Sequence, residues 1–410
     1  MSEWESFRIK DFGKVVTGKT PPTVDKEFYN KGYKFVTPTD LDFNSYYIRH
    51  TQREVSEKAR NRYPNYFLPP DSVSYTCIGA TIGKSCLNRE YVLTNQQINS
   101  IIPNKSSNAR FIYYYLNAIT PSIVAVAGGA ATPIVNKSSF ESIKINVPPL
   151  PTQQKIAKTL SNYDDLIENN LKRIKLLEES ARLTYEEWFL RFRIDGKKLD
   201  IDTATGLPFE WEVRKISDFV DTASGGTPSR RKPEEFYKDG TIPWVKTKEL
   251  KNFMIIDADE HITEQGLKKS SAKMFPANTV LLAMYGNTIG EVTFSTFPTS
   301  TNQACCAFLV KDKAYLSYFI HQYLLKNKQK ILGYRMGAAQ ENISQQIIKS
   351  IEIEIPSESL LQLFGKRLSE KYNLIKSLHT QNQLLKEARD ILLPRLMTGM
   401  IDTDNMDIAV

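Results

Sequence analysis

The stretch GATIG at residues 79–83 occurs again as GNTIG at residues 286–290, and this repetition decides how the chain is organised. Further islands match at the same offset of 207–209 residues: Trp4-Glu5 and Trp211-Glu212, Asp11-Phe12 and Asp218-Phe219, Thr20-Pro21 and Thr227-Pro228, EFY at 27–29 and 235–237, TNQ at 94–96 and 301–303, Gly129-Ala130 and Gly337-Ala338, and IKINVP at 143–148 and IEIEIP at 351–356. Chance does not keep one offset across so many separate islands. The period is also far too long for a solenoid, so the chain is a duplicated domain of about 205 residues.

Each copy ends in a segment with a different periodicity. Apolar positions there follow spacings of 4, 3, 4, 3, which is the seam of a coiled-coil helix. The seam of the first copy is Ile156, Leu160, Tyr163, Ile167, Asn170, Ile174, Leu177, Ala181, Thr184 and Trp188; that of the second is Phe364, Leu368, Lys371, Ile375, Leu378, Asn382, Leu385, Arg389 and Leu392. The prolines within 148–151 and Pro356 predict the two helix starts, and Pro394 with Gly399 predicts the end of the second helix.

The block before each helix, roughly 150 residues long, mixes alternating strand-like stretches, Gly and Pro punctuation, and short helical stretches near 111–118 and 315–325. The polar run between Phe192 and Trp211 is interpreted as a linker. The predicted fold is α+β: two pseudo-symmetric mixed α/β domains separated by two long antiparallel helices that form a coiled coil. The predicted segments are a domain at 1–150, a helix at 151–192, a linker and second domain at 193–355, a helix at 356–400 and a tail at 401–410.

Two asparagines interrupt the seams near their centres. A pseudo-twofold axis places Asn170 and Asn382 at symmetric levels about the middle of the helix pair, so they are expected to face each other. Buried asparagines cost stability but fix register, because sliding the helices would leave both amides unpaired. The alternative is that each amide reaches solvent at the edge of the seam. A helix of roughly 39 residues would be about 58 Å long.

Composition and charge restrict the function class. The chain has 54 Lys and Arg against 46 Asp and Glu, a net charge of +8 that permits a polyanionic partner. Its four cysteines, Cys77, Cys86, Cys305 and Cys306, give neither a disulfide framework nor a CxxC metal site, and they are interpreted as small buried hydrophobes. No signal-like segment or membrane-length apolar run is found, so a cytoplasmic protein is expected.

Catalytic motifs are missing. The string GATIGKS at 79–85 has three residues between its glycines where a P-loop has four, and Glu291 replaces Lys84 in the second copy, so a tight turn between strands is expected instead. The four histidines are far apart and have no metal-ligand spacing. No nucleophile elbow, methyltransferase motif or acidic nuclease cluster was found, so the chain is expected to be non-catalytic and to bind no metal.

Cationic clusters occur at matching places in the two copies. The candidate DNA-binding residues are Lys19, Lys34, Arg49, Arg53, Lys58, Arg60 and Arg62 in the first copy, and Arg230, Arg231, Lys232, Lys246, Lys248, Lys251, Lys268, Lys269 and Lys273 in the second. Lys and Arg neutralise phosphates, and Arg also binds base edges. One such cluster is more often a solvated face, but two at matching places favour DNA binding.

Two strings carry a resemblance to a known family. INVPPLPTQQKIA at 145–157 resembles the entry into the first conserved helix of the specificity subunits of type I restriction-modification enzymes, and LLPRLMTGMI at 392–401 resembles the exit from the second. The resemblance covers essentially the whole chain, although the entry to the second helix lacks the PPLP run. It implies two target recognition domains, each binding one half of a split sequence in double-stranded DNA, with two long antiparallel helices between them.

The resemblance also implies partners. These are two methyltransferase subunits that bind S-adenosylmethionine and nuclease/translocase subunits that hydrolyse ATP with Mg, so no cofactor is expected on this chain. Outward residues of the helices are expected to dock partners, and those considered are Glu178, Glu179, Arg182, Glu186 and Glu187.

Two other readings remain. One is a stand-alone DNA-modifying enzyme, a nuclease or methyltransferase with duplicated recognition domains; the other is a coiled-coil adaptor that does not bind DNA. Under the recognition hypothesis, specificity resides where the copies differ, because shared base-contacting residues would select the same half-site. Gly83, Gly290, Asn95 and Asn302 are therefore expected to shape turns rather than to select bases.

Overall fold

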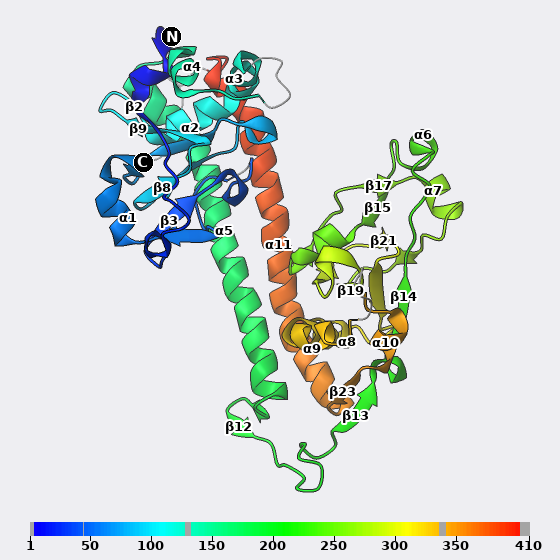
Figure 1. Cartoon of the computed structure of the whole chain (residues 1–410). Helices are drawn as coiled ribbons and strands as arrows, with labels where there is room; N and C mark the ends of the chain where they lie inside the picture. Colours follow the sequence, from blue (N-terminus) through cyan, green and yellow to red (C-terminus); the bar gives the residue numbers. More distant parts are fainter. Residues whose placement is uncertain (1–3, 44, 128–132, 336–341, 402–410) are drawn as a thin grey trace. The chain divides into compact units, whose positions relative to one another are not determined.

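The computed structural model describes residues 4–43, 45–127, 133–335 and 342–401, which form two compact units (Figure 1). Unit 1 comprises residues 1–168 and 383–410, and unit 2 comprises residues 169–382. The boundaries between the units therefore fall inside the two long helices. The matched Gly-Ala pairs at 129–130 and 337–338, and the tail after residue 401, lie outside the described residues.

The globule of unit 1 contains two four-stranded sheets and one separate strand pair. The larger sheet is antiparallel, in the order β2 (Gly13–Thr17), β9 (Ile98–Pro103), β6 (Val73–Thr76), β7 (Ser85–Leu87). The second, called here the small sheet of unit 1, has the order β4 (Arg53–Val55), β3 (Tyr33–Val36), β8 (Val92–Thr94), β5 (Phe67–Leu68). The pair is β1 (Glu5–Arg8) with β10 (Lys144–Val147), and the short helices are α1 (Glu57–Arg62), α2 (Ala109–Ala118), α3 (Thr120–Val126) and α4 (Lys137–Ser142).

Unit 2 repeats this topology. Its larger sheet has the order β14 (Asp221–Ser224), β22 (Cys305–Leu309), β19 (Thr279–Ala283), β20 (Val292–Ser295), β16 (Met254–Ile255). The small sheet of unit 2 has the order β17 (His261–Ile262), β15 (Ile242–Val245), β21 (Thr299–Thr301), β18 (Met274–Phe275), and β13 (Glu212–Lys215) pairs with β23 (Glu352–Ile355). The short helices are α6 (Pro233–Phe236), α7 (Glu264–Lys268), α8 (Tyr315–Lys326), α9 (Lys328–Leu332) and α10 (Gln345–Ser350).

The two small sheets match strand by strand. In each, the second strand runs parallel to the third and antiparallel to the first, and the fourth is antiparallel to the third. Unit 2 differs by the added edge strand β16. The duplication predicted from the repeated islands is thus confirmed in the topology.

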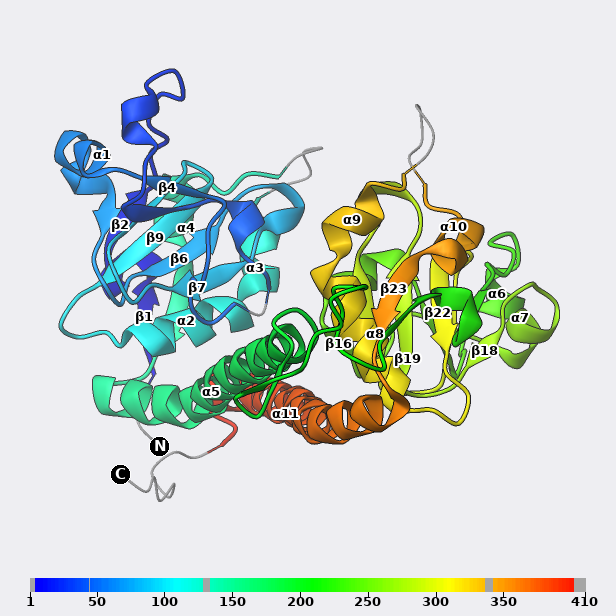
Figure 2. The ribbon, with the colours of Figure 1, turned by 90° about the horizontal axis from the view of Figure 1, so that it is seen from below.

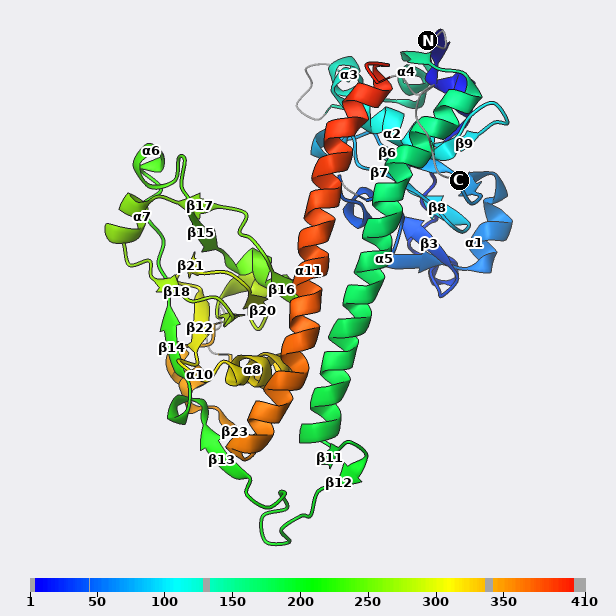
Figure 3. The same cartoon turned by 180° about the vertical axis from the view of Figure 1, so that it is seen from behind.

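A buried helix connects the larger sheet of each unit to the long helices. In α2, every residue from Phe111 to Leu116 is buried, and the helix packs on the β6–β7 side of the sheet (Figure 2). In unit 2, α8 holds the same place, against β19 and β20 (Figure 3). A helix that is buried on nearly all sides needs apolar residues in continuous runs, which both sequences provide.

The long helices are α5 (Leu150–Phe189) and α11 (Glu358–Met397), each of 40 residues. Within unit 2 they are antiparallel, because Asn170 contacts Asn382 while Ser180 contacts Lys371. The second helix ends at Met397, between Pro394 and Gly399 and close to the predicted end. Pro394 lies inside α11, and its carbonyl accepts the Thr398 amide at 3.0 Å, so the helix tolerates the missing N–H near its last turn.

Most seam positions are buried, in two groups. In unit 1, Ile156 and Leu160 join a core that includes Leu396. In unit 2, the core contains Ile174, Ala181 and Trp188 from α5 and Phe364, Leu368, Ile375 and Leu378 from α11. Lys371 is an exception, because its neighbour Tyr372 takes the buried position and its ammonium contacts Ser180 at 3.0 Å.

The segment between Phe192 and Trp211 is more ordered than a polar linker. It contains a hairpin, β11 (Arg193–Ile194) with β12 (Lys197–Lys198), and Leu199 and Leu207 pack against the core of unit 2. Burial of these apolar side chains holds the segment against the core of unit 2. No helix in the described part of the chain is long and apolar enough to cross a membrane.

The repeated TIG islands form turns between strands, as predicted. Gly83 lies in the connection from β6 to β7 with φ of 102°, and Gly290 lies between β19 and β20 with φ of 80°. Side chains other than glycine rarely adopt these angles. All four cysteines are buried and free, which confirms their interpretation as small core residues.

Candidate nucleic-acid interface

The predicted DNA-binding residues of unit 1 lie mainly on its small sheet and on the adjoining helix. Five of them are Lys34 on β3, Arg53 on β4, and Lys58, Arg60 and Arg62 on α1. Lys19 follows β2, and its backbone amide bonds to the Thr94 carbonyl of β8 at 2.8 Å. Arg49 differs, because its guanidinium pairs with Glu168 of α5. The structure therefore brings six of the seven residues to one sheet and its edges.

The nine predicted residues of unit 2 surround the matching sheet. They are Arg230, Arg231 and Lys232 before α6, Lys246 directly after β15, Lys248 and Lys251 on the 3₁₀ helix Thr247–Lys251, Lys268 at the end of α7, and Lys269 and Lys273 between α7 and β18. The small sheet, together with α6 and α7, forms one end of unit 2 (Figure 1). The matching cationic clusters of the sequence thus correspond to one subdomain that occurs twice.

Ion pairing separates these cations into two classes. Nine of the sixteen contact a carboxylate: Lys34, Arg49, Lys58, Arg230, Lys232, Lys246, Lys248, Lys268 and Lys269. Among the described residues the other seven form no ion pair: Lys19, Arg53, Arg60, Arg62, Arg231, Lys251 and Lys273. Exposed ion pairs contribute little free energy, so the first class can still exchange a carboxylate for a phosphate.

A pair of aromatic rings lies at the same place in both small sheets. In unit 1 it is Tyr29 with Phe35, whose ring centroids are 6.2 Å apart. In unit 2 it is Tyr237 with Trp244, at 6.0 Å. Each tyrosine hydroxyl donates to a proline carbonyl, that of Pro21 in unit 1 and that of the equivalent Pro228 in unit 2. We call these two rings the aromatic pair of each unit.

An arginine guanidinium lies over each aromatic pair. The guanidinium carbon of Arg53 is 5.6 Å from the Tyr29 centroid and 5.2 Å from that of Phe35. The guanidinium carbon of Arg230 is 4.1 Å from the Tyr237 centroid and 5.0 Å from that of Trp244. Arginine stacks on aromatic faces by cation–π attraction, which restrains its planar donor group.

The two arginines have different electrostatic surroundings. Both guanidinium nitrogens of Arg230 bond to the Glu260 carboxylate, and Lys246 also bonds to Glu260 at 2.5 Å. These hydrogen bonds, that from Arg230 above all, lower the pKa of Glu260 to about 2. Arg53 forms no ion pair with any described residue, and its side chain is exposed. One guanidinium is therefore free to donate, and the other is held by a carboxylate.

The shared islands maintain the loops next to the aromatic pairs. Thr20 donates to Gln96 at 2.5 Å in unit 1, and Thr227 donates to Gln303 at 2.5 Å in unit 2. Asn302 accepts the Ala304 amide with its side chain, and Asn95 accepts the Gln97 amide in the same way. These bonds support the expectation that the shared residues shape turns.

The aromatic pairs were not identified from the sequence. The repeated EFY island marked Tyr29 and Tyr237 as equivalent, which was a usable signal. Phe35 and Trp244 are different residue types, however, and the arginines come from different segments of the two copies. Only the strand pairing brings these residues together.

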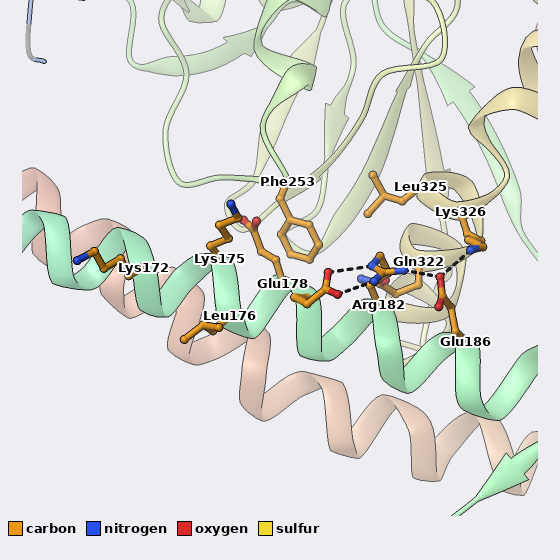
Figure 4. A pocket seen from close by; sticks show the side chains of 11 residues that line it. Lys172, Lys175, Leu176, Glu178, Arg182, Glu186, Phe253, Gln322, Leu325 and Lys326 are labelled. Carbon is orange, nitrogen blue, oxygen red and sulfur yellow. Dashed lines mark hydrogen bonds and ion pairs between the residues drawn. The ribbon is translucent and has the colours of Figure 1, made fainter. Parts of the chain in front are cut away.

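A second candidate surface is the outer face of α5 in unit 2. Arg182 bonds to Glu179 and Glu186, and Lys326 of α8 bonds to Glu186 at 2.6 Å, beside a cavity of about 780 Å³ (Figure 4). The expectation that Glu186 faces outward is wrong, because it is buried between α5 and α8. Glu178 also lines this cavity, and burial raises its pKa to about 7.

In the described part of the chain, no three His, Cys, Asp or Glu side chains are grouped so that they could hold a metal ion. His321 is fully buried, and burial lowers its pKa to about 3. Its Nδ1 lies 2.6 Å from the Tyr372 hydroxyl, so its role is packing within unit 2.

Comparison with known proteins agrees with this geometry. The sequence model of the type I restriction modification DNA specificity domain matches residues 1–179 and 208–387, one match for each copy of the duplication. The chain belongs to this family.

Among its relatives, the MjaIX specificity subunit of Methanocaldococcus jannaschii is 28% identical over 98% of this chain and 95% of the relative. The HindI specificity subunit of Haemophilus influenzae is 23% identical, over 82% of this chain and 85% of that subunit. The solved S subunit of a type I restriction-modification system from M. genitalium has the same fold, with a TM-score of 0.58 and 16% identity over 96% of both chains.

Proposed function

We propose that this chain is the DNA sequence-recognition subunit of a type I restriction-modification complex. Each unit carries one target recognition domain, and each domain binds one half of a bipartite target in double-stranded DNA. The observation that carries this proposal is the small sheet with its cationic rim, present once in each unit. Cationic side chains bind phosphates irrespective of sequence, and residues that differ between the domains provide the specificity.

The chain itself binds no cofactor under this proposal. Methyltransferase subunits, two per chain, supply S-adenosylmethionine, and nuclease/translocase subunits supply ATP and Mg. The chemistry would then lie on the partners, and this chain would determine where on DNA it takes place. Purified alone, it is expected neither to methylate nor to cut DNA.

The long helices supply a surface for these partners. Leu176 and Leu183 of α5, and Leu190 directly after its end, recur at intervals of seven residues and are 69%, 41% and 44% exposed. A heptad stripe of exposed leucine supports docking of a further helix. Glu179, Arg182 and Glu187 flank this stripe with charge.

The direct test is DNA binding by the purified chain, with and without a co-expressed methyltransferase subunit. Gel-shift titration against a random-sequence duplex pool, followed by sequencing of the bound fraction, is expected to give two short conserved blocks separated by unread base pairs. Exchanging residues 196–355 for the same region of a relative should change one block and leave the other. A bound pool with no conserved block, or a change in both blocks, would contradict the proposal.

The number of base pairs between the two half-sites, called here the unread gap, offers a further test of the same proposal. α5 is continuous over 40 residues, and four inserted residues add about one helical turn. Insertion after Ile174 should lengthen the gap or abolish binding, while both half-site sequences stay the same. An active insertion variant with an unchanged gap would show that the helices do not set the spacing.

A further inference from the structure

The strand register of the two small sheets establishes an equivalence that the sequence offset of 207–209 residues leaves open. In unit 1, Arg53 of β4 pairs with Phe35 of β3. In unit 2, the β15–β17 ladder pairs Pro243 with His261, and at the next step the Trp244 amide bonds to the Glu260 carbonyl at 2.8 Å. Arg53 and Glu260 therefore occupy the same position, each opposite the buried ring of its aromatic pair.

This position carries opposite charges in the two units. In unit 2, the guanidinium over the rings comes instead from Arg230, which follows β14. Its equivalent at the offset of the Thr-Pro island is Thr23, so unit 1 has no second arginine there. The net charge of each site is nevertheless +1, because Arg53 stands alone while Arg230 and Lys246 together outweigh Glu260.

The site is rigid where a base-contacting side chain needs support. Phe35 and Trp244 are 1% and 2% exposed, and the Trp244 indole N–H donates to the Gly226 carbonyl at 3.0 Å. The side chains above them reach solvent, since Arg230 is 52% and Glu260 24% exposed and Arg53 is classed as exposed. Buried rings beneath exposed polar groups hold those groups in fixed orientations.

We propose that the position occupied by Arg53 in unit 1 and by Glu260 in unit 2 determines one base pair of each half-site. Arg53 presents free donors, which suit the O6 and N7 acceptors of guanine. Glu260 presents an acceptor, which suits the amino group of cytosine. The inference rests on the proposed function and assigns its specificity to named residues.

The cations around Glu260 are part of this assignment. A carboxylate near DNA is repelled by phosphates unless neighbouring cations compensate it. Arg230 and Lys246 provide that compensation, and their hydrogen bonds also fix the carboxylate. Arg230 is therefore a positioning residue in unit 2, whereas Arg53 is a direct contact in unit 1.

The experiment is selection of bound duplexes from a random pool by the full chain in complex with methyltransferase subunits. The chain is compared as wild type, Arg53→Ala, Arg53→Lys and Glu260→Gln. Arg53→Ala should reduce discrimination at one base pair of one half-site by about tenfold or more, the range expected for a bidentate contact. Glu260→Gln should relax one base pair of the other half-site.

Two variants separate base selection from electrostatics and folding. Arg53→Lys keeps the charge but loses the planar fork, so it should retain affinity for non-specific DNA and lose the base preference. Arg62→Ala, on exposed α1, removes a cation that has no ion pair among the described residues, so it should weaken binding to all sequences equally. Circular dichroism of each variant checks that the fold is intact.

The outcomes are distinguishable. If the wild type selects no bipartite sequence, the proposed function fails. If the wild type selects one but Arg53→Ala and Glu260→Gln retain every base preference, the function stands and this inference is overturned. Reduced affinity with unchanged preferences would also overturn it, because the position would then contact phosphates alone.

Discussion

Units 1 and 2 place different chemistry at the same buried junction between the short core helix and the long helices. In unit 1, Tyr114 of α2 donates to Asp164 of α5 at 2.5 Å, and Asp164 pairs with Arg389 of α11. In unit 2, the equivalent residues at the 208-residue offset are Gln322, Tyr372 and Ala181. Gln322 there donates to the Tyr372 hydroxyl at 2.8 Å. One fold thus accommodates a charged network in one copy and a neutral network in the other.

This difference shows that variation between the copies is not confined to the small sheets and their cationic residues. At the buried junction, a pair of charges must be changed together, because one charge without the other is costly in a low-dielectric interior. Above the buried aromatic pairs, by contrast, the exposed position carries Arg53 in one unit and Glu260 in the other, where cations from other segments compensate the carboxylate. The first kind of change affects stability, and our proposal assigns the second to specificity.

Removing one charge from the network of unit 1 should have the largest effect. Arg389 is 7% exposed and Asp164 is 3% exposed, so Asp164→Ala leaves a buried guanidinium without its main partner. We expect a loss of about 3–5 kcal/mol in the free energy of unfolding, measured by denaturant titration with circular dichroism. The double variant Asp164→Leu/Arg389→Met, which makes the junction neutral as in unit 2, should recover most of that loss. Equal losses in the single and double variants would contradict this account.

The asparagine pair should give the next largest effect. Asn170 donates to Asn382 at 2.9 Å and to Gln381 at 2.8 Å, and the two asparagines are 3% and 5% exposed. Asn170→Leu leaves the buried side-chain oxygen of Asn382 without its donor, which should cost about 2 kcal/mol. Replacing both residues with leucine should restore stability, measured by the same titration.

The role of these asparagines in fixing register remains a prediction, and the double-leucine variant tests it. Spin labels at exposed positions of α5 and α11 in unit 2 would report the distance between them. A single sharp distance in the wild type and a broadened distribution in the double variant are expected. An equally sharp distribution in both would remove the register role, while the hydrogen bond itself would stand.

Loss of one partner from the neutral network of unit 2 should reduce the free energy of unfolding less than loss of one charge from the network of unit 1. Tyr372→Phe removes the hydroxyl that contacts both His321 and Gln322. We expect a cost of about 1 kcal/mol, because neutral hydrogen bonds contribute less than a buried ion pair that loses one partner. Unfolding titrations of Tyr372→Phe and Asp164→Ala under the same conditions compare the two junctions directly. A cost for Tyr372→Phe as large as that for Asp164→Ala would remove the contrast.

The sequence was sufficient for features that depend on repetition and periodicity. The offset of the islands predicts the duplicated topology, and the heptad seams predict α5 and α11 to within three residues at each end. Pro394 and Gly399 lie on either side of the end of α11, although proline in the last turn costs only one hydrogen bond and does not by itself end the helix. Helix-ending rules are statistical, and the cost at any one position depends on the local packing.

The candidate site depended on information that a linear offset does not contain. The islands on either side of Arg53 have offsets of 208 and 207, which match it to His261 or to Glu260, and the strand register selects Glu260. Strand pairing shifts by one residue when a connecting loop changes length, so equivalence at a sheet edge has to be read from the ladder. The sequence alone therefore left the charge exchange at the aromatic pairs ambiguous.

The smallest effect is expected at Glu178, where the two units again differ in charge. Its equivalent in unit 1 is Lys386. Burial favours the uncharged form of each side chain, so it raises the pKa of Glu178 and lowers that of Lys386. The pKa of Glu178 rises from 4.5 to about 7 in the folded chain. Between these values the unfolded chain loses the proton and the folded chain keeps it, so the free energy of unfolding falls as the pH rises and the full penalty is present above pH 7.

Glu178→Gln removes this titration. At pH 4.5 the variant should match the wild type in calorimetric melting, and at pH 8 it should melt higher by about 2 °C, a modest shift because the side chain lines an open cavity. Glu179→Gln is the matched control, since the Arg182 hydrogen bond lowers the pKa of Glu179 and its loss should leave Tm at pH 8 unchanged or slightly reduced. If Glu178→Gln followed the wild-type melting temperature at every pH, Glu178 would be solvated in the folded chain, and the contrast with Lys386 would reflect surface charge rather than burial.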